Sequence, residues 1–344
     1  MNILLTGAAG FIGSHLLESL LHEGARVTAV DNFDSFYPRF HKEANLAAVK
    51  HHPGLRLCET DICDIDSLHD LAGDYDCLVH LAAKAGVRPS IADPVAYHRT
   101  NVTGTRNLLE CARTWGVRQF VFASSSSVYG ISPKVPWSED NRAVMPISPY
   151  ASTKLNGELL GHAYSQLYGI RFVALRLFTV YGPRQRPDLA IRKFSEMILA
   201  NRPIPVFGDG STSRDYTFVG DIVPAIRAAM DYRGSNYEII NVGNEQPVSL
   251  LEMIRTVESA LGETAVIEPH GAQPGDVPRT WARIAKAKRL LGYSPKTTFA
   301  EGVLRFVSWL RERSTDAEVS ELVGLKPAGE ASPDQRNRGH ADSP

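Results

Sequence analysis

The chain has 344 residues, of which 37 are basic and 38 acidic, so its formal net charge is −1. Hydrophobic residues make up 43% and charged residues 22%, an ordinary globular composition that excludes a mostly disordered chain and gives no reason to expect nucleic acid or a membrane as a partner. No stretch approaches 18 uninterrupted apolar residues, the N-terminus lacks the pattern of a secretory signal, and the four cysteines form no CxxC pair, so we expect a cytoplasmic protein with free thiols.

The first half of the chain alternates short apolar runs with segments of helical spacing. The predicted strands are Ile3–Thr6, Arg26–Val30, Leu55–Glu59, Cys77–Leu81, Gln119–Ser124 and Arg171–Leu177, and the predicted helices are Phe11–Glu23, Ile65–Leu71, Val95–Trp115 and Pro149–Tyr168. This alternation predicts an α/β fold of the Rossmann type, a doubly wound parallel sheet with helices on both faces.

After Gly182, prolines and glycines interrupt the pattern, and the predicted helices Leu250–Leu261 and Ile284–Leu291 lie among loops. We therefore expect a dinucleotide-binding domain over 1–180, to which a segment of about 217–245 returns. A smaller, interleaved α/β lobe for the substrate follows over 181–313. Residues 314–344 are rich in Pro, Gly and charge and are expected to form a flexible tail.

A glycine-rich turn directly follows the first strand. Gly7, Gly10 and Gly13 let the backbone approach a pyrophosphate at the start of the first helix. Asp31 ends the second strand, where a carboxylate accepts hydrogen bonds from a ribose 2′-hydroxyl and repels a 2′-phosphate, which favours NAD over NADP. Asp61 and Ile62 follow the third strand, where an adenine edge is expected, and Leu81, Ala82 and Ala83 follow the fourth, where small residues let the backbone close over the dinucleotide.

Tyr150 and Lys154 are four residues apart on one predicted helix face. A nearby ammonium stabilises a phenolate, so this pair predicts a tyrosine base with a lowered pKa. The run of serines at 124–127 ends the fifth strand at the carboxyl edge of the sheet, where ligands bind in such folds, so one hydroxyl can share a hydrogen bond with Tyr150 and a substrate hydroxyl.

With these motifs together, the chain resembles the extended short-chain dehydrogenase/reductase family, and within it the nucleotide-sugar epimerases, from Thr6 to about Trp309. The resemblance is carried by TGAAGFIG at 6–13, SSSSVYG at 124–130, YASTK at 150–154 and PGDV at 274–277. It implies Ser125, Tyr150 and Lys154 as catalytic residues and a resident NAD that takes a hydride from sugar C4 and returns it to the other face. It also implies cofactor contacts by Phe11, Ile12, Asn32, Lys84 and Asn101.

Two features resemble the UDP-glucuronate 4-epimerases in particular. Ser126 and Ser127 stand where related 4,6-dehydratases carry Asp and Glu, so an elimination or a decarboxylation is disfavoured. In the segment FTVYGPRQRPD at 178–188, the resemblance implies that Thr179 and Arg186 hold the sugar carboxylate. A UDP-glucose 4-epimerase is the alternative, because similar loops occur in relatives that epimerise neutral sugars. A catalytically silent, NAD-sensing protein is the alternative from another class.

The resemblance implies further substrate contacts from Arg88, Ser126 and Ser127, and contacts to the UDP half from Lys193, Val206, Phe207, Arg214, Asp276 and Arg279. Lys84, Arg88, Arg184, Arg186, Arg214 and Arg279 would then form a local positive excess around an anionic substrate, which the neutral overall charge conceals. The resemblance also implies a homodimer formed through the helices Val95–Trp115 and Pro149–Tyr168. The faces of these helices that are expected to be exposed are not strongly apolar in sequence. No metal ligand set is recognised.

Overall fold

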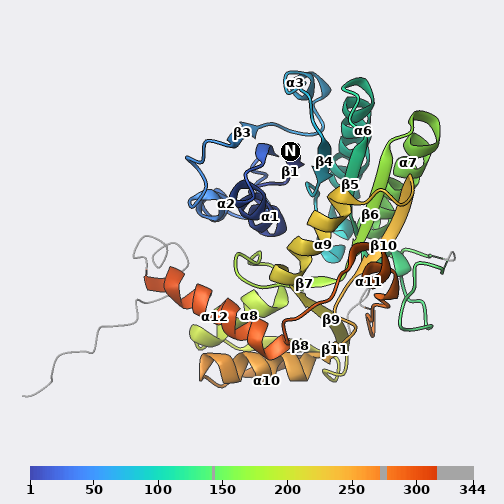
Figure 1. Cartoon of the computed structure of the whole chain (residues 1–344). Helices are drawn as coiled ribbons and strands as arrows, with labels where there is room; N and C mark the ends of the chain where they lie inside the picture. The colour runs from blue at the N-terminus through green and yellow to red at the C-terminus, as the bar shows by residue number, and fades with distance from the viewer. Residues whose placement is uncertain (142–143, 272–276, 316–344) are drawn as a thin grey trace, which may run out of the picture.

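The computed structural model describes residues 1–141, 144–271 and 277–315, and its centre is a seven-stranded parallel sheet (Figure 1). The strand order is β10-β6-β5-β4-β1-β2-β3. These strands are β1 (Asn2–Thr6), β2 (Arg26–Asp31), β3 (Leu55–Glu59), β4 (Cys77–His80), β5 (Gln119–Ser125), β6 (Arg171–Leu177) and β10 (Tyr237–Val242). β1, β4, β5 and β6 are buried on both faces, as expected of central parallel strands with continuous apolar sequence. The predicted fold class is confirmed.

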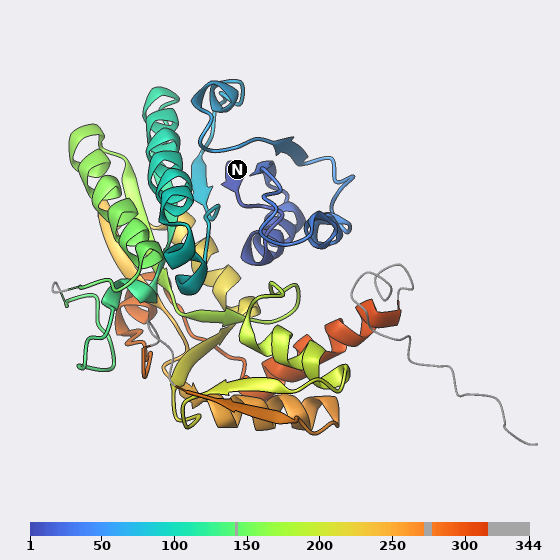
Figure 2. The same ribbon diagram turned by 180° about the vertical axis from the view of Figure 1, so that it is seen from behind.

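Helices cover both faces of this sheet. They are α1 (Phe11–His22), α2 (Arg39–Leu46), α3 (Ile65–His69), α4 (Val87–Ala92), α5 (Pro94–His98), α6 (Gly104–Thr114), α7 (Pro149–Tyr168) and α9 (Val219–Asp231), with a π-helical turn Arg99–Thr103 and a 3-10 turn Ser126–Tyr129. α1 packs against α9, and α6 stands beside α7 in both views (Figures 1 and 2). Successive β1 side chains therefore enter two separate cores: Ile3 and Leu5 pack on the α1 side and Leu4 on the α6 side.

The second lobe lies below the sheet in Figure 1 and contains two small sheets. One has the order β11-β9-β7 and the other pairs β12 with β8. Its elements are β7 (Thr179–Tyr181), α8 (Ala190–Leu199), β8 (Ile204–Phe207), β9 (Ser213–Phe218), β11 (Pro247–Ser249), α10 (Leu250–Leu261), β12 (Ile267–His270) and α12 (Phe299–Thr315). α11 (Ala285–Leu291) packs against β10 and α9 of the first lobe. Because β10 lies in the large sheet, the chain returns to the first lobe between segments of the second.

The structure differs from the sequence prediction in several places, and strands β7 to β12, including β10 of the large sheet, were not predicted. The single helix expected over 95–115 is divided into α5, the π-helical turn and α6. The sequence did not predict five of the helices, namely α2, α4, α8, α9 and α12. In α9, Pro224 argues against a helix when only the sequence is considered. The expected tail begins at 314, whereas α12 continues to Thr315, and the rest of that tail lies outside the described residues.

Candidate active site

A cavity of about 470 Å³ opens at the carboxyl ends of the central strands, and residues from both lobes line it. It lies where the strand order reverses between β1 and β4, the position at which open α/β sheets bind ligands. Nineteen of the predicted site residues line this one cavity: Gly7, Gly10, Phe11, Ile12, Gly13, Asp31, Asn32, Ile62, Leu81, Ala82, Ala83, Lys84, Ser125, Ser126, Ser127, Tyr150, Lys154, Thr179 and Arg186.

The glycine turn has no room for side chains. Gly7 has φ +72°, and a Cβ there would lie 2.7 Å from the backbone nitrogen of Ala82. A Cβ on Gly13 would lie 2.0 Å from the carbonyl oxygen of Gly7. α1 starts directly after this turn at Phe11, so the first N–H groups of the helix have no partner within it. They face a cradle, which is a concave surface that the backbone of the glycine turn forms without side chains. This cradle fits a dinucleotide pyrophosphate.

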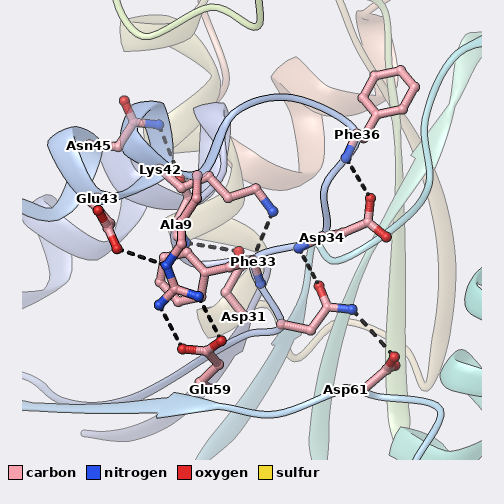
Figure 3. A network of polar contacts seen from close by, with 12 residues as sticks. Ala9, Asp31, Phe33, Asp34, Phe36, Lys42, Glu43, Asn45, Glu59 and Asp61 are labelled. Atoms are coloured by element: carbon pink, nitrogen blue, oxygen red, sulfur yellow. Dashed lines mark hydrogen bonds and ion pairs between the residues drawn. The ribbon is translucent and has the colours of Figure 1, made fainter.

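Asp31 lies in a buried polar network beside this turn (Figure 3). Its carboxylate accepts hydrogen bonds from the backbone N–H groups of Ala9 (3.1 Å) and Phe33 (2.9 Å), and Lys42 Nζ lies 3.2 Å away. Asn32 accepts from the Asp34 N–H and donates to Asp61. A carboxylate has about four acceptor sites, so Asp31 keeps capacity for a ribose hydroxyl. Lys42 was missed from the sequence, because α2 was not predicted and nothing local links it to Asp31.

The three predicted catalytic side chains meet where β5 ends and α7 begins. Ser148 caps α7 by accepting from the Ala151 N–H at 3.2 Å, and this start places Tyr150 and Lys154 one turn apart. Lys154 Nζ donates to the Ala123 carbonyl oxygen at 2.7 Å. The Ser125 hydroxyl donates to Ser127 Oγ at 3.1 Å and accepts from the Ser127 N–H at 3.2 Å, and it lies close enough to Tyr150 to influence the phenol.

The charges around Tyr150 differ from the sequence prediction. Burial raises the pKa of Tyr150, and the groups that oppose this rise are the Ser125 hydrogen bond and the positive charge of Arg186. Burial also lowers the pKa of Lys154 to about 7. The predicted lowering of the Tyr150 pKa is therefore wrong for this structure, because burial outweighs the effects of Ser125 and Arg186 and the Lys154 ammonium is directed at the Ala123 carbonyl oxygen.

Arg186 reaches the cavity from the loop between β7 and α8. Its Nε and Nη2 atoms lie 2.9 and 2.7 Å from the two carboxylate oxygens of Asp188, and its guanidinium lies 5.4 Å from the Phe36 ring centroid. Its side chain is 18% exposed. Thr179, the first residue of β7, lines the same cavity. A cation is thus available beside the Tyr150 phenol.

Other predicted residues lie outside the lining of this cavity. Arg88 lies over the Phe207 ring at 5.2 Å from its centroid, which joins α4 to β8. Arg214 and Arg279 both contact Ser213, and Asn101 holds the Lys84 backbone through two hydrogen bonds. Asp276 lies outside the described residues. The roles of Asp61, Arg88, Asn101, Lys193, Val206, Phe207, Arg214, Asp276 and Arg279 stay predictions.

The expected local positive excess is smaller than predicted. Lys84 lies 3.0 Å from Asp34, Arg184 lies 2.6 Å from Glu18, and Arg186 is paired with Asp188. Arg184 is directed at α1 and does not line the cavity. Three of the six cations are therefore neutralised by acidic side chains. These acids lie nearby in the structure, but only Asp188 is also close to its partner in sequence.

Two negative findings concern metal binding and membrane insertion, and both hold for residues 1–141, 144–271 and 277–315. These residues hold no group of three or more His, Cys, Asp or Glu side chains that could bind a metal ion. Within the same residues, no helix is both long and apolar enough to span a bilayer. All four cysteines are free.

A dinucleotide cradle and a Ser–Tyr–Lys set in one cavity define a nucleotide-dependent oxidoreductase or epimerase site. The profile of the NAD-dependent epimerase/dehydratase family matches residues 3–243, and the chain belongs to that family. The family resemblance recognised from the motifs is confirmed.

Relatives within this family are similar over nearly the whole chain. A UDP-glucuronate 4-epimerase of Thermodesulfobacterium geofontis is 41% identical over 313 residues, which cover 90% of this chain and 96% of the relative. The solved structure of UDP-glucuronic acid 4-epimerase from Bacillus cereus, in complex with UDP-glucuronic acid and NAD, is 38% identical with a TM-score of 0.86, over 91% of this chain and 99% of that one. A UDP-glucose 4-epimerase of Thermotoga maritima with UDP-glucose is 32% identical with a TM-score of 0.82, over 91% and 99%.

Proposed function

We propose that this protein is an NAD-dependent UDP-sugar 4-epimerase that interconverts UDP-glucuronate and UDP-galacturonate through a 4-keto sugar. The observation that carries the proposal is the Arg186 guanidinium, which lines the same cavity as Ser125, Tyr150 and the glycine turn. A partly buried cation beside the reacting phenol is suited to a sugar that bears a carboxylate. The UDP-glucuronate epimerases among the relatives support the same substrate.

The cofactor would be held by the glycine cradle and the Asp31 network. The start of α1 would bind the pyrophosphate and Asp31 the adenine ribose. When bound, NAD supplies the hydride acceptor for sugar C4 and later the donor. Lys154, whose ammonium is already fixed near the cavity, would bind the nicotinamide ribose.

The chain's own residues would move the proton of the sugar 4-hydroxyl. Tyr150 acts as the base, and Ser125 holds both the phenol and the substrate hydroxyl through its own hydroxyl group. Ser126 and Ser127, which stay un-ionised near pH 7, lack the groups for a dehydratase. Arg186 and Thr179 hold the carboxylate near the plane of the 4-ketone, which disfavours loss of CO₂ from this β-keto acid.

The UDP half would lie toward the second lobe. Arg88 and Phe207 already join the two lobes there, and Arg214 and Arg279 converge on Ser213. These cations would face the diphosphate, with Lys193 and Val206 beside the base and Asp276 on the uridine ribose.

UDP-glucose is the second candidate substrate, and the Arg186–Asp188 pair favours it. A neutral sugar would leave that pair intact, whereas a uronate must share Arg186 with Asp188. A silent NAD-sensing protein is less well supported, because Ser125, Tyr150 and Lys154 are all present in one cavity.

Arg186→Leu tests the substrate assignment. Hydrogen bonds to a charged group contribute about 1.5–3 kcal/mol, so kcat/KM for UDP-glucuronate should fall about 10- to 100-fold, with a smaller change for UDP-glucose. Products are resolved by NMR, and Arg202→Leu, an exposed arginine of the same lobe, is the control. If the wild type converts UDP-glucose but makes no UDP-galacturonate from UDP-glucuronate, the uronate assignment is wrong.

We also propose a homodimer formed through α6 and α7. α7 exposes Leu159 (62%), Leu167 (71%) and Tyr168 (44%), so its outer surface is more apolar than the sequence suggests, whereas α6 exposes no large apolar side chain. Leu159 and Leu167 are eight residues apart and share one helix face. Leu159→Lys should shift the mass measured by light scattering from dimer to monomer, and Leu304→Lys on α12 serves as the control. An unchanged mass would contradict this interface.

The proposed site of action is the cytoplasm. Four free thiols, two of them buried, suit a reducing compartment, as does a nucleotide-sugar substrate with NAD.

A further inference from the structure

The loop that carries Arg186 is tied to α1, the helix that follows the glycine turn. His15 Nε2 lies 2.9 Å from the Pro183 carbonyl oxygen, and Arg184 Nη2 lies 2.6 Å from Glu18 Oε1. His15 and Glu18 are three residues apart and so lie on one face of α1. Burial lowers the pKa of His15, which keeps the ring neutral and lets it donate one hydrogen bond to the carbonyl.

The Glu18–Arg184 pair is shielded from solvent. The two side chains are 21% and 17% exposed, whereas the pairs on the outer faces of α2 and α12 are about half exposed. A shielded pair in hydrogen-bonding geometry is screened less by salt and defines a geometry better than an exposed pair does.

Arg184 adopts a backbone conformation that a side chain rarely takes. Its φ is +65°, in the left-handed region, which is unfavourable for any residue with a Cβ unless its surroundings impose it. The turn is closed by the Gln185 N–H, which donates to the Gly182 carbonyl oxygen at 3.1 Å. On the other side, Arg192 Nη1 donates to the Gln185 carbonyl oxygen at 2.8 Å.

This conformation separates two arginines that are only two residues apart. Arg184 is directed at Glu18 on α1, while Arg186 lines the cavity beside Tyr150. If Arg184 left the left-handed region, the following residues would turn and the Arg186 guanidinium would move. The contact to Glu18 therefore anchors the loop on the side of α1, while Asp188 holds the Arg186 guanidinium itself.

We propose that Glu18 and Arg184 are positioning residues that aim Arg186 and thereby set the preference of the enzyme for a uronate over a neutral sugar. This inference rests on the proposed function. The pair touches neither the reacting atoms nor the cavity lining, so it acts through the loop. It also links the helix that starts at the cofactor cradle to the loop that holds the sugar carboxylate.

The readout is the ratio of kcat/KM for UDP-glucuronate to that for UDP-glucose, measured on the holoenzyme. Small misplacements of a positioning group can cost up to about 100-fold, so Glu18→Gln and Arg184→Met should each lower this ratio about tenfold. The loss should lie in KM for UDP-glucuronate. kcat for UDP-glucose and the amount of bound NAD should stay within about twofold of the wild-type values. Such a result distinguishes a misplaced Arg186 guanidinium from a general loss of structure.

Three further variants make the test specific. Arg184→Gly removes the anchor to Glu18 and frees the backbone without strain at the positive φ, so the loop is less fixed and the ratio of kcat/KM values should fall without a lower Tm. Glu18→Arg/Arg184→Glu restores a pair of opposite charges, so the ratio of kcat/KM for UDP-glucuronate to that for UDP-glucose should return most of the way to the wild-type value. Glu23→Gln breaks the ion pair between α1 and Arg227 of α9, away from the loop, and should leave the ratio unchanged.

The outcomes separate this inference from the proposed function. A wild type that makes no UDP-galacturonate overturns both. A wild type that prefers UDP-glucuronate, with Glu18→Gln, Arg184→Met and Arg184→Gly retaining that preference, overturns only the role of the pair. An equal loss of kcat/KM for UDP-glucuronate and UDP-glucose in all these variants would also overturn the positioning role, because the pair would then be merely structural.

Discussion

Replacement of Tyr150 by phenylalanine should lower kcat for epimerisation of UDP-glucuronate by about 10²–10⁴-fold, the range typical of a lost general base. The phenyl ring can fill the same buried space, and the edge-to-face contact with Tyr97 at 6.3 Å does not need the hydroxyl. The glycine cradle and the Asp31 network are unchanged, so bound NAD should remain. Product formation is followed by NMR, and NAD is quantified after the protein is denatured.

Tyr97→Phe is the matched control for Tyr150→Phe. Tyr97 is buried and donates its hydroxyl proton to the Ala85 carbonyl oxygen at 3.0 Å, but it is not part of the cavity lining. Its removal should change kcat only a few-fold. Full activity of Tyr150→Phe, or equal losses in the two variants, would remove Tyr150 from the role of base.

Most of the central sheet could be predicted from the sequence, because each of these strands is recognisable from its own residues and the turns beside it. β1, β4, β5 and β6 are short apolar runs bounded by turns, and burial on both faces makes the runs continuous. α7 also has its signals in the sequence, with Ser148 as cap, Pro149 in the first turn and Gly169 in the left-handed conformation at its end. For α9, tertiary packing outweighs the helix-breaking signal of Pro224, since Ile222, Ile226 and Met230 are fully buried.

Spacing alone predicted the parts of the candidate site that lie within one element, and the resemblance to a family supplied the rest of the nineteen cavity residues. Tyr150 and Lys154 share a helix face, and the glycine turn is contiguous. By contrast, Lys42 reaches Asp31 from a different element, and the opposite directions of Arg184 and Arg186 depend on one backbone angle. The acids that neutralise Lys84 and Arg184 lie 50 and 166 residues away in the chain. Such pairings follow from the fold and have no local signal.

The free energy of unfolding should fall by about 3–5 kcal/mol in Arg176→Met, because the variant leaves a charge buried without its partner. Arg176 on β6 binds Glu158 on α7 through two hydrogen bonds of 2.9 and 2.8 Å, and both side chains are at most 3% exposed. Glu158 also accepts a hydrogen bond from Ser124, the neighbour of Ser125, and follows Lys154 by one helical turn. The lost cation would therefore disturb the junction that positions the catalytic residues as well.

Urea denaturation of three variants tests this account of the buried pair. Arg171→Met on the same strand removes a partly exposed arginine that contacts Gln119 and should cost less than about 1.5 kcal/mol. The double variant Glu158→Leu/Arg176→Met removes both charges and should recover much of the loss, because replacing a buried ion pair by apolar groups is often nearly neutral. A double variant less stable than Arg176→Met would contradict the account, since the cost would then come from lost packing and not from an isolated charge. Because the charges are removed and the volume is largely kept, the comparison separates electrostatics from packing at the centre of the fold.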